Sequence, residues 1–203
     1  LHKGKEVVDI DRAAQKVIAS DGTEASYDRL LIATGSTPFI IPVPGHELEG
    51  VIGFRDIHDV DNMLEASRQH QHAVVIGGGL LGLEAANGLM QQGMKVTVLH
   101  LMDTLMERQL DSVAGKMLRK SLEERGLEIL LQASTKELKA DENGSRVQSV
   151  LLEDGREIAA DLVVMAVGIR PDFSLAEKVG IHCERGIVVS ETMQTFGPKV
   201  YAV

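Results

Sequence analysis

The chain has 203 residues, of which 44% are hydrophobic and 25% charged, and its formal net charge is −9. This composition predicts a soluble globular protein with one or two cores, and the negative charge argues against nucleic acid or an anionic membrane as a partner. No apolar run is long enough to cross a membrane, and the single cysteine, Cys183, excludes an internal disulfide framework and suits a reducing, cytoplasmic compartment.

The first fifty residues predict short strands followed by a loop. Apolar residues between positions 7 and 18 favour strands of a meander, and Asp21-Gly22 predicts a tight hairpin turn. A further strand is expected over 27–34, leading into the turn at 35–38. A loop rich in proline and glycine over 42–45 is then expected to cross between domains.

From residue 56 onwards the pattern alternates between helices and strands. Asp56 is a predicted N-cap, and Gly126 is a predicted helix end. In chain order the expected elements are a helix over 56–69, a strand over 73–76, a helix over 80–90, a strand over 95–99, a helix over 111–124 and a strand over 127–131. In the third helix, the residues expected to line one face are Val113, Met117, Leu118 and Leu122.

A second meander completes this part of the chain. Asn143-Gly144 and Asp154-Gly155 are predicted turns, and the meander ends in a buried strand over 162–166. Strand, helix, strand, helix and strand followed by a meander predict an α/β fold with a doubly wound parallel sheet, as in a Rossmann-like nucleotide-binding domain.

A glycine-rich turn separates the strand over 73–76 from the helix over 80–90. Gly77, Gly79 and Gly82 fit G-x-G-x-x-G with a strand before and a helix after, which is the context that the motif requires. The pattern predicts a tight turn, a close approach of backbone to a diphosphate at the helix N-terminus, and close packing of helix on strand. The candidate dinucleotide-binding residues are Gly77, Gly78, Gly79, Leu80, Leu81 and Gly82. The alternative is a glycine-rich turn without a ligand.

An acidic residue usually ends the second strand of such a unit, about 20 residues beyond the glycine loop, and binds the adenosine ribose. Here that position holds His100, 23 residues after Gly77. A neutral imidazole can bind a ribose hydroxyl without attracting a 2′-phosphate, and the next arginine is only Arg108. The sequence therefore favours NADH over NADPH, although His100 as a plain surface residue at a strand end is the alternative.

Residues 21–38 and 154–171 form an internal repeat with a constant offset of 133. They align without gaps, and the coinciding residue types are Asp, Gly, Glu, Asp, Ala, Gly and Pro. Convergence of common turns is the alternative, but a match through to the proline favours duplication. In the second copy the glycine loop precedes Gly168 by 91 residues, so that of the first copy would lie roughly 56 residues before Leu1. We therefore expect an internal fragment.

Two nucleotide-binding units that each close with Ala-x-Gly-x-x-Pro resemble the FAD-dependent pyridine nucleotide-disulfide oxidoreductase superfamily. The resemblance covers the whole chain. It implies a partial FAD-binding domain over 1–50, continued by 171–203, and an NAD(P)H-binding domain over 51–170. It also implies that Glu84 lies near the nicotinamide and the flavin. A carboxylate among small apolar residues is costly to bury without a purpose, whereas a first-turn acid favoured by the helix dipole is the alternative.

The same resemblance implies that backbone at two turns passes close to the cofactors. Val167, Gly168 and Ile169 would lie near the nicotinamide, and Thr34 and Gly35 near the flavin, because a side chain at either glycine would obstruct the ligand. Alternatively, these glycines only turn the chain.

Four segments are similar, more narrowly, to the family of nitrite reductase large subunits: 30–38, 50–59, 77–89 and 105–111. This resemblance implies hydride transfer from NADH to FAD and electron transfer to iron–sulfur and sirohaem centres in downstream modules or a small subunit, outside this chain. A homodimer is compatible with it. A rubredoxin or ferredoxin reductase and a non-catalytic dinucleotide sensor remain alternatives.

The fragment itself is expected to bind NADH and to catalyse nothing. No acid–base residue is expected, because the redox chemistry belongs to the cofactors. No metal is assigned, because the seven histidines lack the spacing of metal ligands.

Overall fold

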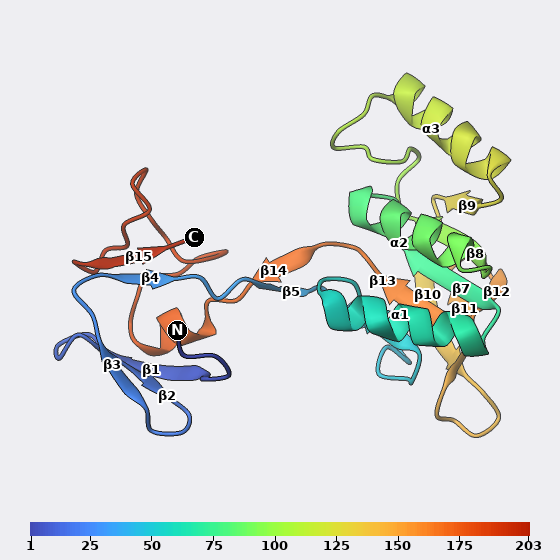
Figure 1. Cartoon of the computed structure of the whole chain (residues 1–203). Coiled ribbons are helices and arrows are strands. Elements are labelled where there is room, and N and C mark those ends of the chain that lie inside the picture. Colours follow the sequence, from blue (N-terminus) through green and yellow to red (C-terminus); the bar gives the residue numbers. More distant parts are fainter. The chain divides into compact units, whose positions relative to one another are not determined.

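The computed structural model describes residues 1–203, and its contacts divide the chain into two compact units. Unit 1 comprises Leu1–Thr37 and Ile169–Val203, and unit 2 comprises Pro38–Gly168 (Figure 1). The segment 38–50 lies in unit 2, so the observed boundary falls earlier than the predicted one near residue 50. The reason is packing, because apolar side chains of this segment contact the core of unit 2: Ile40, Ile41, Val43 and Leu48.

Unit 2 is built on a five-stranded sheet in which all neighbouring strands are parallel. In spatial order the strands are β6 (Val51–Gly53), β13 (Leu162–Met165), β7 (His72–Ile76), β8 (Lys95–His100) and β9 (Glu128–Leu131). The central strands β13 and β7 are almost wholly buried, as expected for apolar runs in a parallel sheet. The sequence does not predict β6, because three residues are too few to show a period.

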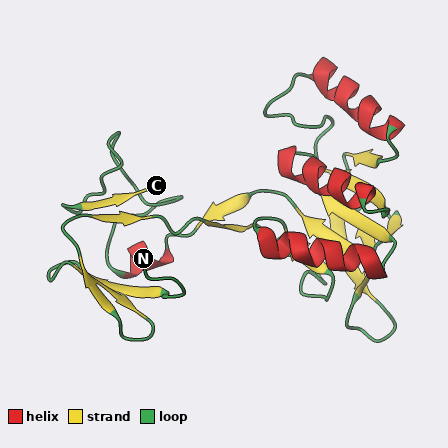
Figure 2. Ribbon diagram, viewed as in Figure 1, coloured by secondary structure: helices red, strands yellow, loops and turns green.

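Different layers cover the two faces of this sheet. On one face lie the helices α1 (Ile57–Gln69), α2 (Leu80–Gln91) and α3 (Ser112–Glu124), and on the other the antiparallel strands β10 (Thr135–Ala140), β11 (Val147–Leu152) and β12 (Glu157–Ala159) (Figure 2). Because strand side chains alternate, Val75 joins the helical core whereas Val74 and Ile76 join the core under the meander. The predicted α/β fold with a parallel sheet and a β-meander is confirmed. None of the helices is long and apolar enough to cross a membrane.

The start of α1 follows from its sequence. Asp56 is the N-cap, and its carboxylate accepts from the N–H groups of His58 and Asp59 at 2.8 and 3.2 Å. The carboxylate of Asp59 accepts in return from the N–H of Asp56, which completes a capping box. Two donors of the first turn are thus satisfied within the segment itself.

The predicted helix α3 exists, but its predicted buried face is wrong in part. Val113 and Met117 are 66% and 70% exposed, whereas Gly115 and Leu122 are buried and Leu118 packs against the core. Gly115 faces inward, where a Cβ would lie 2.2 Å from Oγ1 of Thr104, so the close packing of this face requires glycine. A glycine carries no hydrophobic signal, so apolar spacing alone points to the wrong face.

Unit 1 combines a meander with a short parallel pair. The meander consists of β1 (Val7–Asp11), β2 (Lys16–Ala19) and β3 (Glu24–Ser26), and the pair consists of β4 (Leu30–Ile32) and β15 (Val200–Ala202). The helix α4 (Ser174–Lys178) packs with them around a small core that includes Ile10, Ile32 and Ala176. The strand expected over 27–34 is shorter than predicted, because β4 covers only Leu30–Ile32.

The internal repeat is visible in the secondary structure. At the offset of 133, β3 corresponds to β12, and β4 falls within the positions of β13. The short strands β5 (Ser36–Pro38) and β14 (Ile169–Pro171) also correspond, and they pair with each other. The glycines of the two copies share positive φ angles, 72° at Gly35 and 122° at Gly168. Matching elements at a constant offset support duplication.

Candidate functional site

The strand order of unit 2 reverses direction between β7 and β13. The chain runs outward from β7 to β8 and β9, and then returns through the meander to β13 on the other side of β7. In open parallel sheets, ligands bind outside the carboxyl ends of the strands at such a point. The residues that follow these two strands are the glycine loop after Ile76 and the segment 166–168 after Met165. The topology therefore places two predicted groups of site residues at one edge of the sheet.

Two glycines of the loop are required by the approach of neighbouring backbone. A Cβ at Gly77, whose φ is 125°, would lie 2.3 Å from the carbonyl oxygen of Ala166 at the end of β13. A Cβ at Gly82 would lie 1.9 Å from the carbonyl oxygen of Gly77. Any side chain would force these segments apart, so the two glycines bring β13, the loop and α2 into close contact.

Gly78 and Gly79 face different surroundings. A Cβ at Gly78 would lie 2.7 Å from both His100 Cγ and Leu105 Cδ2, whereas nothing lies within 4 Å of a Cβ at Gly79. Gly79 is the N-cap of α2, no side chain caps the helix, and the N–H groups of residues 79–82 have no acceptor in the protein. Free N–H groups beside open space, at the positive end of a helix, suit an anionic ligand.

The exposed stripe of α2 begins at this open space. Leu80 and Leu81 are 58% and 40% exposed. Glu84 lies one turn further along the same stripe and is exposed as well, so the argument from a buried carboxylate is wrong. The helical period explains this, because the buried positions 82, 83, 85, 86 and 89 turn residue 84 away from the sheet. A nicotinamide contact of Glu84 stays a prediction.

His100, at the end of β8, is buried rather than a surface residue, with 8% exposure. The N–H of Gly78 donates to Nδ1 of His100 at 3.0 Å. A neutral imidazole then carries its proton on Nε2, which lies 3.1 Å from Oε2 of Glu107 and donates to it. His100 thus links the glycine loop to a carboxylate in the loop 101–110.

The loop 101–110 is fixed against the glycine loop by further contacts. The N–H of Met106 donates to the carbonyl oxygen of Gly78 at 3.0 Å. Leu105 is fully buried and packs over Gly78. The N–H and C=O of Gly78 are therefore both satisfied by the protein, while the following N–H groups are left free.

The sequence-based candidates do not include Leu105, Met106 or Glu107. These residues follow the strand in a segment without helix or strand, where no periodicity marks which side chains turn inward. Their distance along the chain from Gly77 gives no signal either, because 28 to 30 residues exceed the spacing of about 20 that is usual for the ribose-binding acid.

The other predicted site residues of unit 2 lie next to the glycine loop. Val167 directly follows Ala166, and its nitrogen would lie 3.5 Å from a Cβ at Gly77. Val167 is 37% exposed, and Gly168 has open space around its Cβ position. Both residues follow β13 at the same edge of the sheet as the glycine loop, and their contact with a nicotinamide stays a prediction.

Thr34, Gly35 and Ile169 belong to unit 1. The hydroxyl of Thr34 donates to the carbonyl oxygen of Asp172, and the N–H of Asp172 donates to the carbonyl oxygen of Gly35 at 2.9 Å. Nothing lies within 4 Å of a Cβ at Gly35, and Ile169 is 46% exposed. These residues are open to a ligand, but unit 1 shows no glycine-rich helix N-terminus that would hold a diphosphate.

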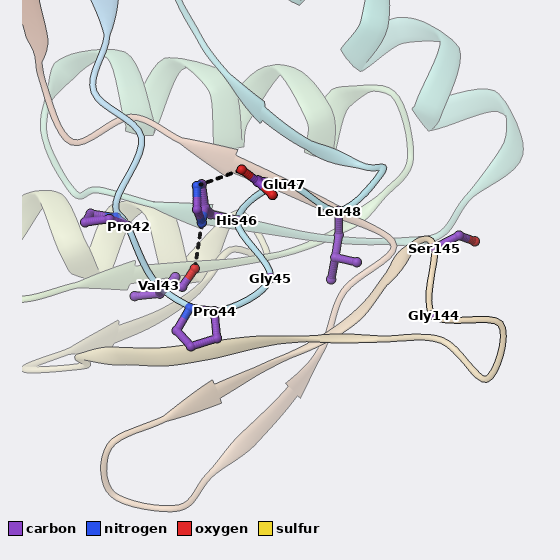
Figure 3. A pocket seen from close by; sticks show the side chains of 9 residues that line it. All are labelled: Pro42, Val43, Pro44, Gly45, His46, Glu47, Leu48, Gly144 and Ser145. Carbon is purple, nitrogen blue, oxygen red and sulfur yellow. Dashed lines mark hydrogen bonds and ion pairs between the residues drawn. The ribbon is translucent and has the colours of Figure 1, made fainter.

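A hollow elsewhere in unit 2 contains none of the candidate residues (Figure 3). It is formed by the loop 42–48 and the hairpin residues Gly144 and Ser145. Its one imidazole, His46, bonds through Nδ1 to the carbonyl oxygen of Val43 at 2.9 Å, and Nε2 lies 3.8 Å from a carboxylate oxygen of Glu47. The ring thus pairs with its own loop.

Cys183 is a half-buried free thiol in unit 1. Burial raises the pKa of this thiol, and the carboxylate of Glu177 raises it further. A raised pKa keeps the sulfur protonated at neutral pH, which disfavours a role as a nucleophile.

Comparison with known proteins finds matches over the whole chain. The model of the pyridine nucleotide-disulphide oxidoreductase family matches residues 1–203. The chain is 50% identical to the nitrite reductase [NAD(P)H] of Bacillus subtilis (strain 168), covering all of this chain and 25% of that protein. It is 43% identical to the assimilatory nitrate reductase electron transfer subunit of the same organism, covering all of this chain and 26% of that protein.

Among solved structures, a ferredoxin reductase from Rhodopseudomonas palustris superposes with a TM-score of 0.92 at 29% identity. The match covers 98% of this chain and 49% of that one. The chain thus spans about a quarter of the length of the two curated relatives and about half of this solved structure.

Proposed function

Because the chain belongs to the pyridine nucleotide-disulphide oxidoreductase family, we propose that unit 2 binds NADH with its diphosphate at the N-terminus of α2. The observation that carries the proposal is the pairing pattern of the glycine loop. The protein itself satisfies the N–H and C=O of Gly78, whereas the N–H groups of residues 79–82 have no acceptor in the protein and no atom lies within 4 Å of a Cβ at Gly79. Two adjacent phosphates are the ligand chemistry that such a row of donors fits.

We further propose that the chain is the NAD(P)H-binding portion of a flavin-dependent reductase that delivers electrons for nitrite reduction. Bound FAD would accept hydride from NADH, and iron–sulfur and sirohaem centres outside this chain would receive the electrons. The 50% identity to a nitrite reductase supports this assignment. In this scheme the chain holds the nicotinamide in the one orientation that allows hydride transfer to the flavin, and no side chain needs to move a proton. Unit 1, over 1–37 and 169–203, is the proposed part of the FAD-binding domain.

Titration with NADH tests the binding site on the chain as it stands. Ala at Gly79 fits the backbone, whose φ of −86° any residue adopts, but its methyl group fills the space proposed for the diphosphate. We expect Gly79→Ala to weaken NADH binding by about 30-fold, the equivalent of one charge-assisted hydrogen bond of about 2 kcal/mol.

Gly88→Ala is the matched control, because Gly88 lies on the same helix and also has nothing within 4 Å of its Cβ position. We expect this variant to bind NADH as the parent chain does. Equal affinities of the Gly79→Ala and Gly88→Ala variants, or a parent chain that does not bind NADH, would refute the proposed site.

A rubredoxin or ferredoxin reductase is the second candidate, supported by the TM-score of 0.92 to a ferredoxin reductase. It uses the same NADH site and differs only in the electron acceptor. Oxidation of NADH by the full-length protein distinguishes the two: nitrite sustains it in the first case, and only an added iron–sulfur or rubredoxin-type protein sustains it in the second. A dinucleotide sensor would bind NADH and oxidise it with neither acceptor.

A further inference from the structure

His100 occupies the position of the usual ribose-binding acid, but its ring has no free polar atom. Nδ1 accepts from the N–H of Gly78 at 3.0 Å, and Nε2 donates to Glu107 at 3.1 Å. The side chain is only 10% exposed. To bind a ribose hydroxyl, the imidazole would have to give up one of these partners inside the protein.

Glu107 is placed to act instead. One carboxylate oxygen, Oε2, accepts from His100, and the other has no partner in the protein. The side chain is 32% exposed, so a ligand can reach part of it. The neighbouring residue, Met106, is bonded through its N–H to Gly78. The carboxylate is therefore held beside the glycine loop by a side-chain contact and a backbone contact one residue away.

We propose that Glu107 determines the choice between NADH and NADPH by accepting hydrogen bonds from the adenosine ribose hydroxyls, with His100 as the positioning residue that holds it. This inference rests on the proposed binding of a dinucleotide at α2. It moves the ribose contact from the strand end, where the sequence motif puts it, to the following loop.

The chemistry of the loop agrees with selection of NADH. A carboxylate accepts from two vicinal hydroxyls, whereas it repels the 2′-phosphate of NADPH. The loop 101–110 carries two carboxylates, Asp103 and Glu107, against one guanidinium, Arg108. Arg108 makes no ion pair in the structure, and the charge next to His100 is the carboxylate of Glu107. The balance of charge around the bound ribose would thus be negative.

Paired titrations with NADH and NADPH test the proposal on the chain 1–203. Glu107→Gln keeps an acceptor for His100 but removes the negative charge. We expect the ratio of NADH to NADPH affinity to fall about tenfold. NADH loses a charged hydrogen-bond acceptor, whereas NADPH loses a repulsion between the carboxylate and its 2′-phosphate. Glu142→Gln, with the same change of charge in the β10–β11 hairpin, is the control and should leave the ratio unchanged.

A variant of His100 separates positioning from structure. The amide of His100→Asn can still accept from the N–H of Gly78 but is too short to reach Glu107. We expect it to lower the same affinity ratio, and we expect the double variant with Glu107→Gln to lower it no further than Glu107→Gln alone. A purely structural role would weaken both nucleotides equally and leave the ratio intact.

Three results would overturn the inference. An unchanged ratio in Glu107→Gln, with NADH still bound, shows that Glu107 does not read the ribose. If the ratio of NADH to NADPH affinity falls only in His100→Asn, His100 itself rather than Glu107 contacts the ribose. If the parent chain binds neither nucleotide, the proposed function itself fails. This outcome differs from a failure of the inference about Glu107, in which NADH is still bound.

Discussion

The closest contact in the glycine loop yields a stability prediction that does not depend on any ligand. In Gly82→Ala the new Cβ would lie 1.9 Å from the carbonyl oxygen of Gly77, where ordinary contact begins near 3.4 Å. The start of α2 would therefore have to retreat from the strand by about 1.5 Å, and its apolar face would lose contact with the sheet. The residues that form this face are Leu83, Ala85, Ala86 and Leu89.

Two opposing effects decide the magnitude. Alanine is a better helix former than glycine by about 1 kcal/mol. Overpacking of a dense core costs about 1–3 kcal/mol, and a clash with backbone lies at the upper end because a carbonyl group cannot change rotamer. We therefore expect Gly82→Ala to destabilise unit 2 by about 2 kcal/mol net, which lowers its melting temperature by roughly 4–8 °C.

Thermal unfolding followed by circular dichroism measures this effect. Gly88→Ala is again the control, because it adds the same methyl group to the same helix without a contact within 4 Å. It should raise the melting temperature by the gain in helix propensity alone. If Gly82→Ala were as stable as Gly88→Ala, the close approach of α2 to the loop would be refuted.

Two further stability predictions follow from hydrogen bonds to carboxylates. The carboxylate of Asp161 accepts from the N–H groups of Gln71 and His72 at 3.1 and 2.9 Å. Burial raises the pKa of Asp161, but these two hydrogen bonds and the nearby histidines lower it by more. The pKa of Asp161 therefore lies below its usual value. The contribution of the carboxylate to stability is therefore present above the unfolded-state pKa and is lost as the pH falls through the folded-state pKa. We expect Asp161→Asn to lower the free energy of unfolding, measured in urea, by about 1 kcal/mol at neutral pH and not to change it in strong acid. An equal loss at both pH values would contradict this. Asp56→Ala should cost about 1 kcal/mol through the lost N-cap of α1, whereas Asp56→Ser should cost only a few tenths, and equal stability of the two variants contradicts the capping box.

The sequence predicts those parts of the fold in which each residue carries its own signal. The strand before Gly77 is a run of buried apolar residues, and the helices α1 and α3 begin at aspartate N-caps. The strand β5 shows no such signal, because it is three residues long and is defined by its pairing with β14. Pairing between segments distant in sequence leaves no local pattern unless, as here, a repeat relates them.

The candidate site divides in the same way. The glycine motif marks the loop because no side chain fits at Gly77 or Gly82, and the need for glycine is visible in the sequence even though Ala166, which limits Gly77, is distant along the chain. The apolar residues next to Glu84 in the sequence predict that its side chain is buried. On the surface of the helix, however, its neighbours are Leu80 and Leu81, which are exposed. The contact between His100 and Glu107 needs the path of the loop 101–110, which depends on the burial of Leu105 against Gly78.

The pairing of the glycine loop explains what holds the turn at which we propose that the diphosphate binds. Gly77 and Gly78 are bonded to β8, His100 and the loop 101–110, so the turn is fixed by protein contacts alone. Among the residues with free N–H groups, Leu80 and Leu81 are exposed, so water can satisfy the start of α2 at little cost. We therefore expect binding at the proposed site to need no reorganisation of the loop, so that its affinity would depend on residues 79–82 and the side chains around them rather than on folding of the turn.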